Sequence, residues 1–256
     1  MGGSHGSHRH VHVPGQSTVH RLTPEAKIVG LVLFVVAVAL TPQRALAVFA
    51  VDAAVLAAVI AASGLPVGVV ARRLAVVAPF VAFAVAIPFV AQGDQTEVLG
   101  VAMSIDGLWS ACSILAKALL GATATLVVSA TTPLPDLLAG MTRLRVPPVM
   151  VAIAAFMLRY LDVLLGQVRR MRDAMTARGH DPRWIWQARP MASSAGALFV
   201  RSYERGERVH HAMAARGYRG SMPDLEVHVA QARDWVVVTV PAAVAVLALL
   251  AALVLT

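Results

Sequence analysis

The chain is built around apolar runs that are each about as long as a membrane is thick and that end at prolines, glycines or polar residues. Hydrophobic residues make up 58% of its 256 residues and charged residues only 14%, whereas a soluble domain carries roughly 25% charged residues. A helix of about 20 apolar residues crosses the roughly 30 Å of hydrocarbon in a bilayer. We therefore predict an all-α polytopic membrane protein, with about five transmembrane helices and two long cytoplasmic helices.

Four of the predicted crossings lie in the first half of the chain and one lies at its end. The first begins at Thr23-Pro24-Glu25, because Thr can cap a helix, Pro fits its first turn and Glu suits its dipole. Pro79 and Pro88 predict kinks in the third crossing. The acidic segment 92–106 is predicted to be a polar loop. The predicted crossings are residues 23–40, 45–62, 72–91, 108–131 and 234–255.

The basic residues predict which side of the membrane each end faces. Cytoplasmic segments collect Lys and Arg, and Arg72, Arg73, Arg143 and Arg145 all fall on the inner side if the amino terminus is inside; only Arg44 is against the rule. The stretch 169–219 is rich in arginine, and a crossing by the apolar residues 149–168 would carry it outside. We therefore expect residues 149–168 to lie along the inner face of the bilayer or to slant into it.

The chain then divides into four parts, and we expect a multi-pass protein of the plasma membrane whose amino terminus and arginine-rich module are cytoplasmic. The parts are a His-rich flexible tail (1–22), transmembrane helices 1–4 (23–132), a cytoplasmic or interfacial module (133–220) and a C-terminal transmembrane helix (234–256). The histidines of the tail could bind Co²⁺, Ni²⁺ or Zn²⁺. A tail without a role is the simpler interpretation.

One six-residue pattern occurs twice in the module. Ala174-Met175-Thr176-Ala177-Arg178-Gly179 is followed later in the chain by Ala212-Met213-Ala214-Ala215-Arg216-Gly217. Gly after the last helical turn permits a left-handed stop, and an Arg in that turn is favoured by the helix dipole. Two ordinary helix ends are the plain alternative. The repeat favours a second interpretation, in which the two arginine side chains bind a partner that offers two matched acidic clefts.

Small residues predict where the two long helices of the module cross. These helices are expected at about 149–178 and 190–216, which corresponds to roughly 45 and 40 Å at 1.5 Å per residue. Gly166 in the first helix and Ser202 and Gly206 in the second would allow close backbone approach.

Other chemistry is weakly indicated. The phosphate-binding pattern G-x-x-x-x-G-K-[ST] is absent, Cys112 is the single cysteine, and the membrane-side rule explains the arginines without nucleic acid. Asp52 and Lys117 lie within predicted crossings, where a charge is costly; they could pair with each other or line a pathway. Glu207, His210 and His211 are spaced for one helix face and could hold a metal, although a solvated helix surface is the simpler interpretation.

These residues resemble the transmembrane (T) component of energy-coupling factor transporters, in its cobalt-type branch, CbiQ. The twin Ala-Arg-Gly motifs carry the resemblance, together with the opening residues 19–27, Met157-Leu158-Arg159-Tyr160 and the run 202–208. The resemblance covers nearly the whole chain from His20 to Pro223.

The resemblance implies a coupling scaffold that is not itself an enzyme. Two ATP-binding cassette ATPase subunits, expected to be a homodimer, would bind the motifs at 177–179 and 215–217. A separate substrate-binding membrane subunit would capture the solute. ATP and Mg²⁺ would be held by the ATPases, so no cofactor and no metal is expected on this chain. Besides these protein subunits, the chain would contact the lipid bilayer.

Three alternatives stay open on the sequence alone. The expected solute is Co²⁺, with Ni²⁺ close behind and a vitamin as a further choice. A self-contained channel or secondary transporter would need charges that converge at the midplane of the bilayer, for which only Asp52 and Lys117 are available. A membrane metalloenzyme would use Glu207, His210 and His211.

Overall fold

The computed structural model describes residues 17–90, 95–98, 101–179, 189–220 and 231–255. The chain forms two compact units, which we call the membrane unit (Met1–Arg143 with Val227–Thr256) and the hairpin unit (Leu144–Glu226). The hairpin unit begins at Leu144, eleven residues beyond residue 133, where the sequence suggested that the module starts.

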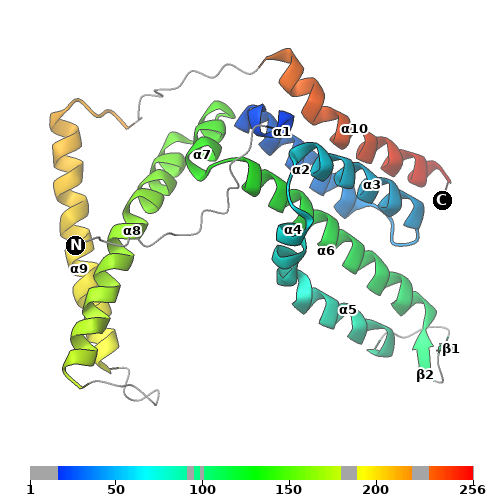
Figure 1. Ribbon diagram of the computed structural model, residues 1–256, viewed down its shortest axis with the longest axis horizontal. Coiled ribbons are helices and arrows are strands. Elements are labelled where there is room, and N and C mark those ends of the chain that lie inside the picture. Colours follow the sequence, from blue (N-terminus) through cyan, green and yellow to red (C-terminus); the bar gives the residue numbers. More distant parts are fainter. Residues whose placement is uncertain (1–16, 91–94, 99–100, 180–188, 221–230, 256) are drawn as a thin grey trace. The chain divides into compact units, whose positions relative to one another are not determined.

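Over its described residues, the membrane unit is helical apart from one short hairpin of strands (Figure 1). The expected bounds of the first, second, fourth and last crossings agree with the observed helices to within three residues. The elements in chain order are α1 (Thr18–Arg21), α2 (Pro24–Leu40), α3 (Leu46–Ser63), α4 (Val67–Leu74), the 3-10 turn η1 (Ala75–Val77), α5 (Ala78–Val90), β1 (Gln95–Val98), β2 (Val101–Ser104), α6 (Ile105–Thr131), α7 (Leu134–Arg143) and α10 (Ala232–Leu255).

Several helices are long and apolar enough to cross a membrane, as predicted. In the part of the chain that the structure describes, four qualify individually, namely α3, α6, α10 and Pro148–Ala177, and α4 with α5 makes a fifth if the bent pair counts as one. The pair is bent by 57° at η1, next to Pro79, where a kink was predicted. With 17 residues, α2 is about 25 Å long, slightly short of the hydrocarbon thickness. The chain is a polytopic all-α membrane protein.

Three local expectations were wrong. Part of the predicted polar loop is an antiparallel hairpin in which Gln95 pairs with Ser104 and Val98 with Val101. The end of the predicted flexible tail forms the helical turn α1, which the side chain of Ser17 caps; residues 1–16 lie outside the described ranges. Thr23 occupies the N-cap position of α2, but its side chain makes no capping hydrogen bond.

Helices α2, α3, α6 and α10 enclose the main apolar core. Gly30 of α2 lies against Val238 of α10 so closely that a Cβ on Gly30 would collide with that side chain. This contact needs glycine for its space, not for its backbone conformation. The buried core residues are Phe34, Ala37, Val38, Phe49, Leu56, Leu120, Ala124 and Ala245.

The charged residues within the crossings do not pair as expected. The Nζ of Lys117 donates to the backbone oxygen of Ala39 at 2.8 Å, so it satisfies a carbonyl that the last turn of α2 leaves without a helical partner. Asp52 is 0% exposed, and neither of its carboxylate oxygens has a hydrogen-bond partner among the described residues. The predicted Asp52–Lys117 pair is therefore wrong, because a nearer backbone acceptor takes the ammonium group.

Arg44, the one residue against the charge rule, has a local explanation. Its guanidinium lies 2.8 Å from the carboxylate of Asp106, and both side chains are exposed. Ser110, one turn further along α6, donates to the side-chain oxygen of Gln43. A polar cluster thus joins the end of α2 to the start of α6, and Asp106 offsets the charge of Arg44.

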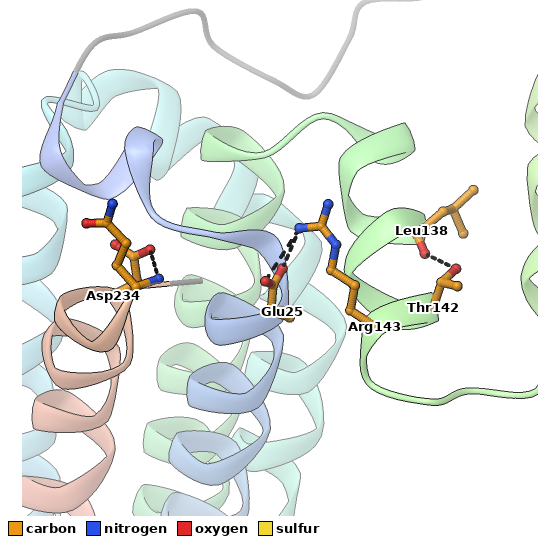
Figure 2. A network of polar contacts seen from close by, with 6 residues as sticks. Glu25, Leu138, Thr142, Arg143 and Asp234 are labelled. Carbon is orange, nitrogen blue, oxygen red and sulfur yellow. Dashed lines mark hydrogen bonds and ion pairs between the residues drawn. The ribbon is translucent and has the colours of Figure 1, made fainter. Parts of the chain in front are cut away.

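The opposite end of the membrane unit gathers four helix ends. The Nζ of Lys27 in α2 donates to the backbone oxygen of Thr131 at the end of α6. Arg143, the last residue of α7, pairs with Glu25 at 3.4 Å (Figure 2). The start of α10 shares a cavity with Leu22 and Thr23, just before α2. The chain therefore leaves the membrane unit after α7 and returns at α10 on the same side.

The position of this shared end helps to decide whether residues 149–168 cross the membrane. A segment that leaves and returns on one side crosses the membrane an even number of times or not at all. The hairpin unit contains a second long helix, Arg189–Ala215, which is not among the described helices that are apolar enough to cross. A lone crossing by Pro148–Ala177 does not fit this arrangement, although its length and composition would allow one.

Cysteine labelling of intact cells tests the shared end. Cys112 is exposed, so it is first replaced by Ser, and single cysteines are then placed at Gln43, Thr142 and Gln231. We expect a membrane-impermeant maleimide to label Gln43→Cys and to leave Thr142→Cys and Gln231→Cys unlabelled until the cells are permeabilised. Labelling of only one of the last two positions would show that the chain between them crosses the membrane.

The packing of α7 on α2 gives a prediction for stability. A Cβ on Gly140 would lie 2.9 Å from the backbone nitrogen of Glu25 and 3.0 Å from the Cβ of Pro24. Gly140→Ala must therefore push α7 outwards, at a cost of about 1–3 kcal/mol, and should lower the Tm of the purified protein in detergent. Gly121→Ala on α6 is the matched control, since no atom lies within 4 Å of its Cβ position. Equal Tm values for the two variants would contradict this packing.

Candidate coupling site at the two ends of a helical hairpin

The hairpin unit consists of two long helices, α8 (Pro148–Ala177) and α9 (Arg189–Ala215). Both agree with the predicted bounds to within one residue. They run in opposite directions (Figure 1): the Oγ of Ser194, near the start of α9, lies 3.6 Å from the Sδ of Met175, near the end of α8. Residues from the start of α8 and the end of α9 line one groove at the other end.

Both Ala-Arg-Gly motifs are helix ends with the same backbone geometry. Gly179 and Gly217 have φ angles of +79° and +84°, the left-handed conformation that glycine adopts without a steric cost. The amide of Gly179 donates to the oxygen of Thr176 at 2.9 Å, and the amide of Gly217 to the oxygen of Ala214 at 3.0 Å. The predicted left-handed stops are confirmed at both sites.

The second end shows the complete Schellman pattern. The amide of Tyr218 reaches back to the oxygen of Met213 at 3.0 Å, outside the bond made by Gly217, which is the pair of bonds that defines this motif. A hydrophobic contact between these two outer positions is typical of it, and Tyr218 and Met213 line the same groove. The residue equivalent to Tyr218 in the first motif is His180, which lies outside the described ranges.

The two arginines are exposed and far apart. Arg178 is the C-cap of α8, and Arg216 follows the last residue of α9; both side chains are exposed, as are the alanines Ala177 and Ala215 that precede them. Because the helices are antiparallel, the motifs lie at opposite ends of the hairpin, separated by roughly 35 to 40 Å at 1.5 Å per residue. Two equivalent arginine-bearing ends thus face solvent at the two extremes of one rigid element.

An apolar groove of about 360 Å³ lies between the helices near the second motif. Phe156 and Tyr160 of α8 stack with their ring centroids 6.3 Å apart, and both line this groove with Met213 of α9. The helix end that carries Arg216 is therefore flanked by apolar side chains on one side. Nothing comparable is described at the Arg178 end, where the chain continues into residues outside the described ranges.

The predicted close crossing is not found at the expected residues. A Cβ on Gly206 would meet no atom within 4 Å, and one on Gly166 would meet only an Nη atom of Arg170, on its own helix, at 3.6 Å. Ser202 donates to the backbone oxygen of Leu198 in its own helix. The reason is that the helices meet through larger side chains, such as Met175, and leave a groove beside Gly206.

The residues proposed for a metalloenzyme do not form a metal site. His210 and His211 have ring centroids 5.8 Å apart, and His210 is turned towards the apolar groove that it lines. Across the described ranges there is no group of three or more His, Cys, Asp or Glu side chains that could hold a metal ion. The metalloenzyme interpretation loses its support.

Comparison with known families decides the relationship. Residues 15–228 match the family described as cobalt transport protein, CbiQ. The chain belongs to the CbiQ family. It is a multi-pass membrane protein of a transport family, and the match takes in both twin motifs.

Individual relatives agree with this membership. The cobalt transport protein CbiQ of Rhodobacter capsulatus is 32% identical over 48% of this chain, and the matched region covers 50% of that protein. A protein of Methanocorpusculum labreanum named as a fused cobalt transport protein CbiMQ is 28% identical over 46% of this chain and is covered to 20% of its length. The energy-coupling factor transporter transmembrane protein EcfT of Brevibacillus brevis is 27% identical over 82% of this chain and 84% of its own length.

One helix of the membrane unit was not predicted from the sequence. Helix α7 precedes α8 by only a few residues and ends at Arg143, which is paired with Glu25. An amphipathic run between Pro133 and Arg143, with Gly140 on one face, was a signal that could have indicated a short docked helix. It was hidden by Pro133 and Pro135, which suggested a break.

The glycines of the twin motifs give a prediction that does not depend on any partner. Gly179→Ala or Gly217→Ala forces a Cβ into the left-handed region, which costs about 1–2 kcal/mol. The last helical turn should therefore open more often, so that its amides exchange roughly five to thirty times faster in hydrogen-exchange mass spectrometry. Gly196→Ala within α9 is the control, because its Cβ position is open. Unchanged exchange in the motif variants would refute the assigned helix ends.

Proposed function

We propose that this chain is the transmembrane coupling subunit of an ATP-driven importer for Co²⁺. In this proposal one ATPase subunit binds the Arg178 end of the hairpin unit and a second binds the Arg216 end. A separate membrane protein binds the ion, and this chain transmits the ATPase motion to it. ATP and Mg²⁺ are held by the ATPases, and the chain carries no cofactor.

The observation that carries the proposal is the pair of equivalent helix ends at opposite extremes of one hairpin. A homodimer offers the same binding surface twice, related by a two-fold axis. Two copies of Ala-Arg-Gly with the same backbone geometry and exposed arginines suit such a pair of surfaces. The Brevibacillus brevis relative is named as the transmembrane protein of an energy-coupling factor transporter, which agrees with this division of labour.

Helix-end geometry suits arginine for this role. The left-handed glycine turns the chain sharply after the arginine, so the guanidinium lies at the tip of the helix beside carbonyls that lack helical partners. A planar guanidinium can make two parallel hydrogen bonds to a carboxylate, which an ammonium group cannot. An acidic cleft on each ATPase subunit is the complementary surface.

The hairpin can transmit motion because it is long and helical and because α8 follows α7 of the membrane unit in the chain. Helices α8 and α9 contain 30 and 27 residues, roughly 45 and 40 Å of rigid element. The first follows α7, which is packed on α2 through Gly140 and paired through Arg143 and Glu25. A displacement of the hairpin would therefore reach the membrane unit through α7.

Cobalt is the favoured solute, because the family and the Rhodobacter capsulatus relative carry that name. Ni²⁺ is the closest alternative, since imidazole-rich and similar sites bind both ions. The orientation proposed here places the amino terminus, α7 and the hairpin unit in the cytoplasm of a cell whose plasma membrane holds the chain, on the basis of the positive-inside rule. A self-contained channel has little support, since Asp52 and Lys117 do not converge.

Substitution of the two arginines tests the coupling role. Removing one partner of a desolvated charge pair costs on the order of 2–5 kcal/mol, and the low end corresponds to roughly a thirtyfold loss of affinity. Arg178→Ala and Arg216→Ala should each weaken co-purification of the ATPases and lower ⁵⁷Co²⁺ uptake by that order. The double variant should nearly abolish both, and Lys should restore little at either position.

Arg172 and Arg208 are the matched controls. Both are exposed arginines of the same two helices, and Arg208 lies 3.8 Å from Glu204, one turn earlier in α9. Their Ala variants should keep ATPase binding and uptake within about twofold. If all four positions lose activity equally, and Lys replaces Arg at each, the arginines act only as a charged surface at the membrane and the coupling role is rejected.

A further inference from the structure

Helix α7 is joined to the first turn of α2 by a charge pair at its last residue. The Nη1 of Arg143 lies 3.4 Å from one carboxylate oxygen of Glu25 and 3.5 Å from the other (Figure 2). The side chain of Glu25 is 7% exposed and that of Arg143 is 23% exposed. A partly buried ion pair is screened much less than a pair on the surface, so this contact ties the two helices together.

A second pair of opposite charges joins the same helices with the reverse polarity. Lys27 of α2 is 4% exposed, and its ammonium group is attracted by the carboxylate of Asp136 in the first turn of α7. The hydrogen bonds of Lys27 go to neutral oxygens, and Asp136 is exposed. The second attraction is therefore the weaker of the two.

Together the two pairs determine how α7 lies on α2. Helix α2 presents a negative side chain at Glu25 and a positive one at Lys27, and α7 presents the opposite signs at Arg143 and Asp136. If α7 ran in the reverse direction, like charges would face each other, which is unfavourable. Gly140 restricts sliding as well, since a Cβ there would lie 2.9 Å from the backbone nitrogen of Glu25.

The pair between Glu25 and Arg143 lies where the chain leaves the membrane unit. Arg143 is the last residue of α7 and of this part of the membrane unit. Only residues 144–147 separate it from Pro148, the first residue of α8. Along the outgoing chain, Arg143 is therefore the first residue of the membrane unit on which a displacement of α8 acts.

We infer that Glu25 and Arg143 are positioning residues for coupling, which pass a displacement of α8 on to α2. The inference rests on the proposed function, in which ATPase subunits drive the hairpin unit. Helix α2 can carry the displacement into the rest of the membrane unit, because its residues Phe34, Ala37 and Val38 belong to the core that it shares with α3, α6 and α10.

A purely structural role for these charges is the alternative. Asp136 lies in the first turn of α7 and Arg143 in its last turn, where an acidic and a basic side chain respectively stabilise the helix dipole. Such a role would affect the stability of α7 but not the amount of Co²⁺ taken up per ATP hydrolysed. It would also not require Glu25, because Arg143 alone complements the dipole.

Reconstitution of the complete transporter in proteoliposomes tests the inference. The complex contains this chain, its ATPases and its substrate-binding subunit, and ⁵⁷Co²⁺ uptake and ATP hydrolysis are measured on the same preparation. Glu25→Gln and Arg143→Gln should each lower the Co²⁺ taken up per ATP hydrolysed by about fivefold or more. Co-purification of the ATPases should be unchanged, because both Ala-Arg-Gly motifs are intact.

Two further variants separate coupling from stability. In Arg143 one nitrogen lies between both oxygens of Glu25, a contact that an ammonium group can imitate, so Arg143→Lys should keep most of the uptake per ATP. Arg145→Gln is the matched control, because Arg145 is exposed and lies only two residues further along; it should leave this ratio unchanged. The Tm of each purified variant reports whether the fold is retained.

Three results would overturn the inference. If Glu25→Gln leaves uptake per ATP unchanged, Arg143 serves only the stability of α7. If Arg145→Gln lowers the ratio as much as Arg143→Gln, the charge of the connection matters and the pair does not. If uptake and ATP hydrolysis fall together with the Tm, the pair is structural. Failure of the proposed function would look different, because the unchanged chain itself would then bind no ATPase.

Discussion

A single buried ammonium group fixes the arrangement of the membrane unit. Lys27 is 4% exposed and directs its three hydrogens at the oxygens of His20, Thr131 and Thr132. A buried charge is costly unless such partners are all present. Because these partners belong to α1 and to the end of α6, satisfying one side chain holds the start of the first long helix against the end of the fourth crossing. Helices α7 and α10 are then packed on the same end, through Gly140 and Val238.

Because α7 ends and α10 begins at this shared end, the packing of the membrane unit agrees with the prediction that residues 149–168 do not cross the bilayer, although α8 is long and apolar enough to do so. The two Ala-Arg-Gly motifs owe their geometry to the backbone at the helix ends. Each leaves carbonyls at the end of a long helix, and the left-handed glycine both satisfies part of them and places an exposed arginine beside the rest.

The features that the sequence predicted well are those that depend on neighbouring residues. The membrane helices follow from the length of the apolar runs. The helix ends at Gly179 and Gly217 follow from the preference for glycine at a position with a left-handed backbone conformation. Some of the missed features are local, such as the hairpin of β1 and β2 and the turn α1, but the others depend on contacts between distant segments. Lys117 was expected to pair with Asp52, but its ammonium group donates to the backbone oxygen of Ala39 in α2, more than 70 residues away in sequence. The docking of α7 and the cavity between Arg21 and Arg233 likewise appear only after α2 and α10 are brought together.

The two chain connections between the units differ in how firmly they are held at the membrane side. On the outgoing side, α7 is fixed by close glycine packing and by the Glu25–Arg143 pair, in which the carboxylate is nearly buried. On the return side, α10 begins with an exposed Gln231–Asp234 hydrogen bond next to an open polar cavity. The outgoing connection is therefore fixed to α2 at the last residue of α7, whereas on the return side the close contact with α2 is made by Val238, further along α10, against Gly30.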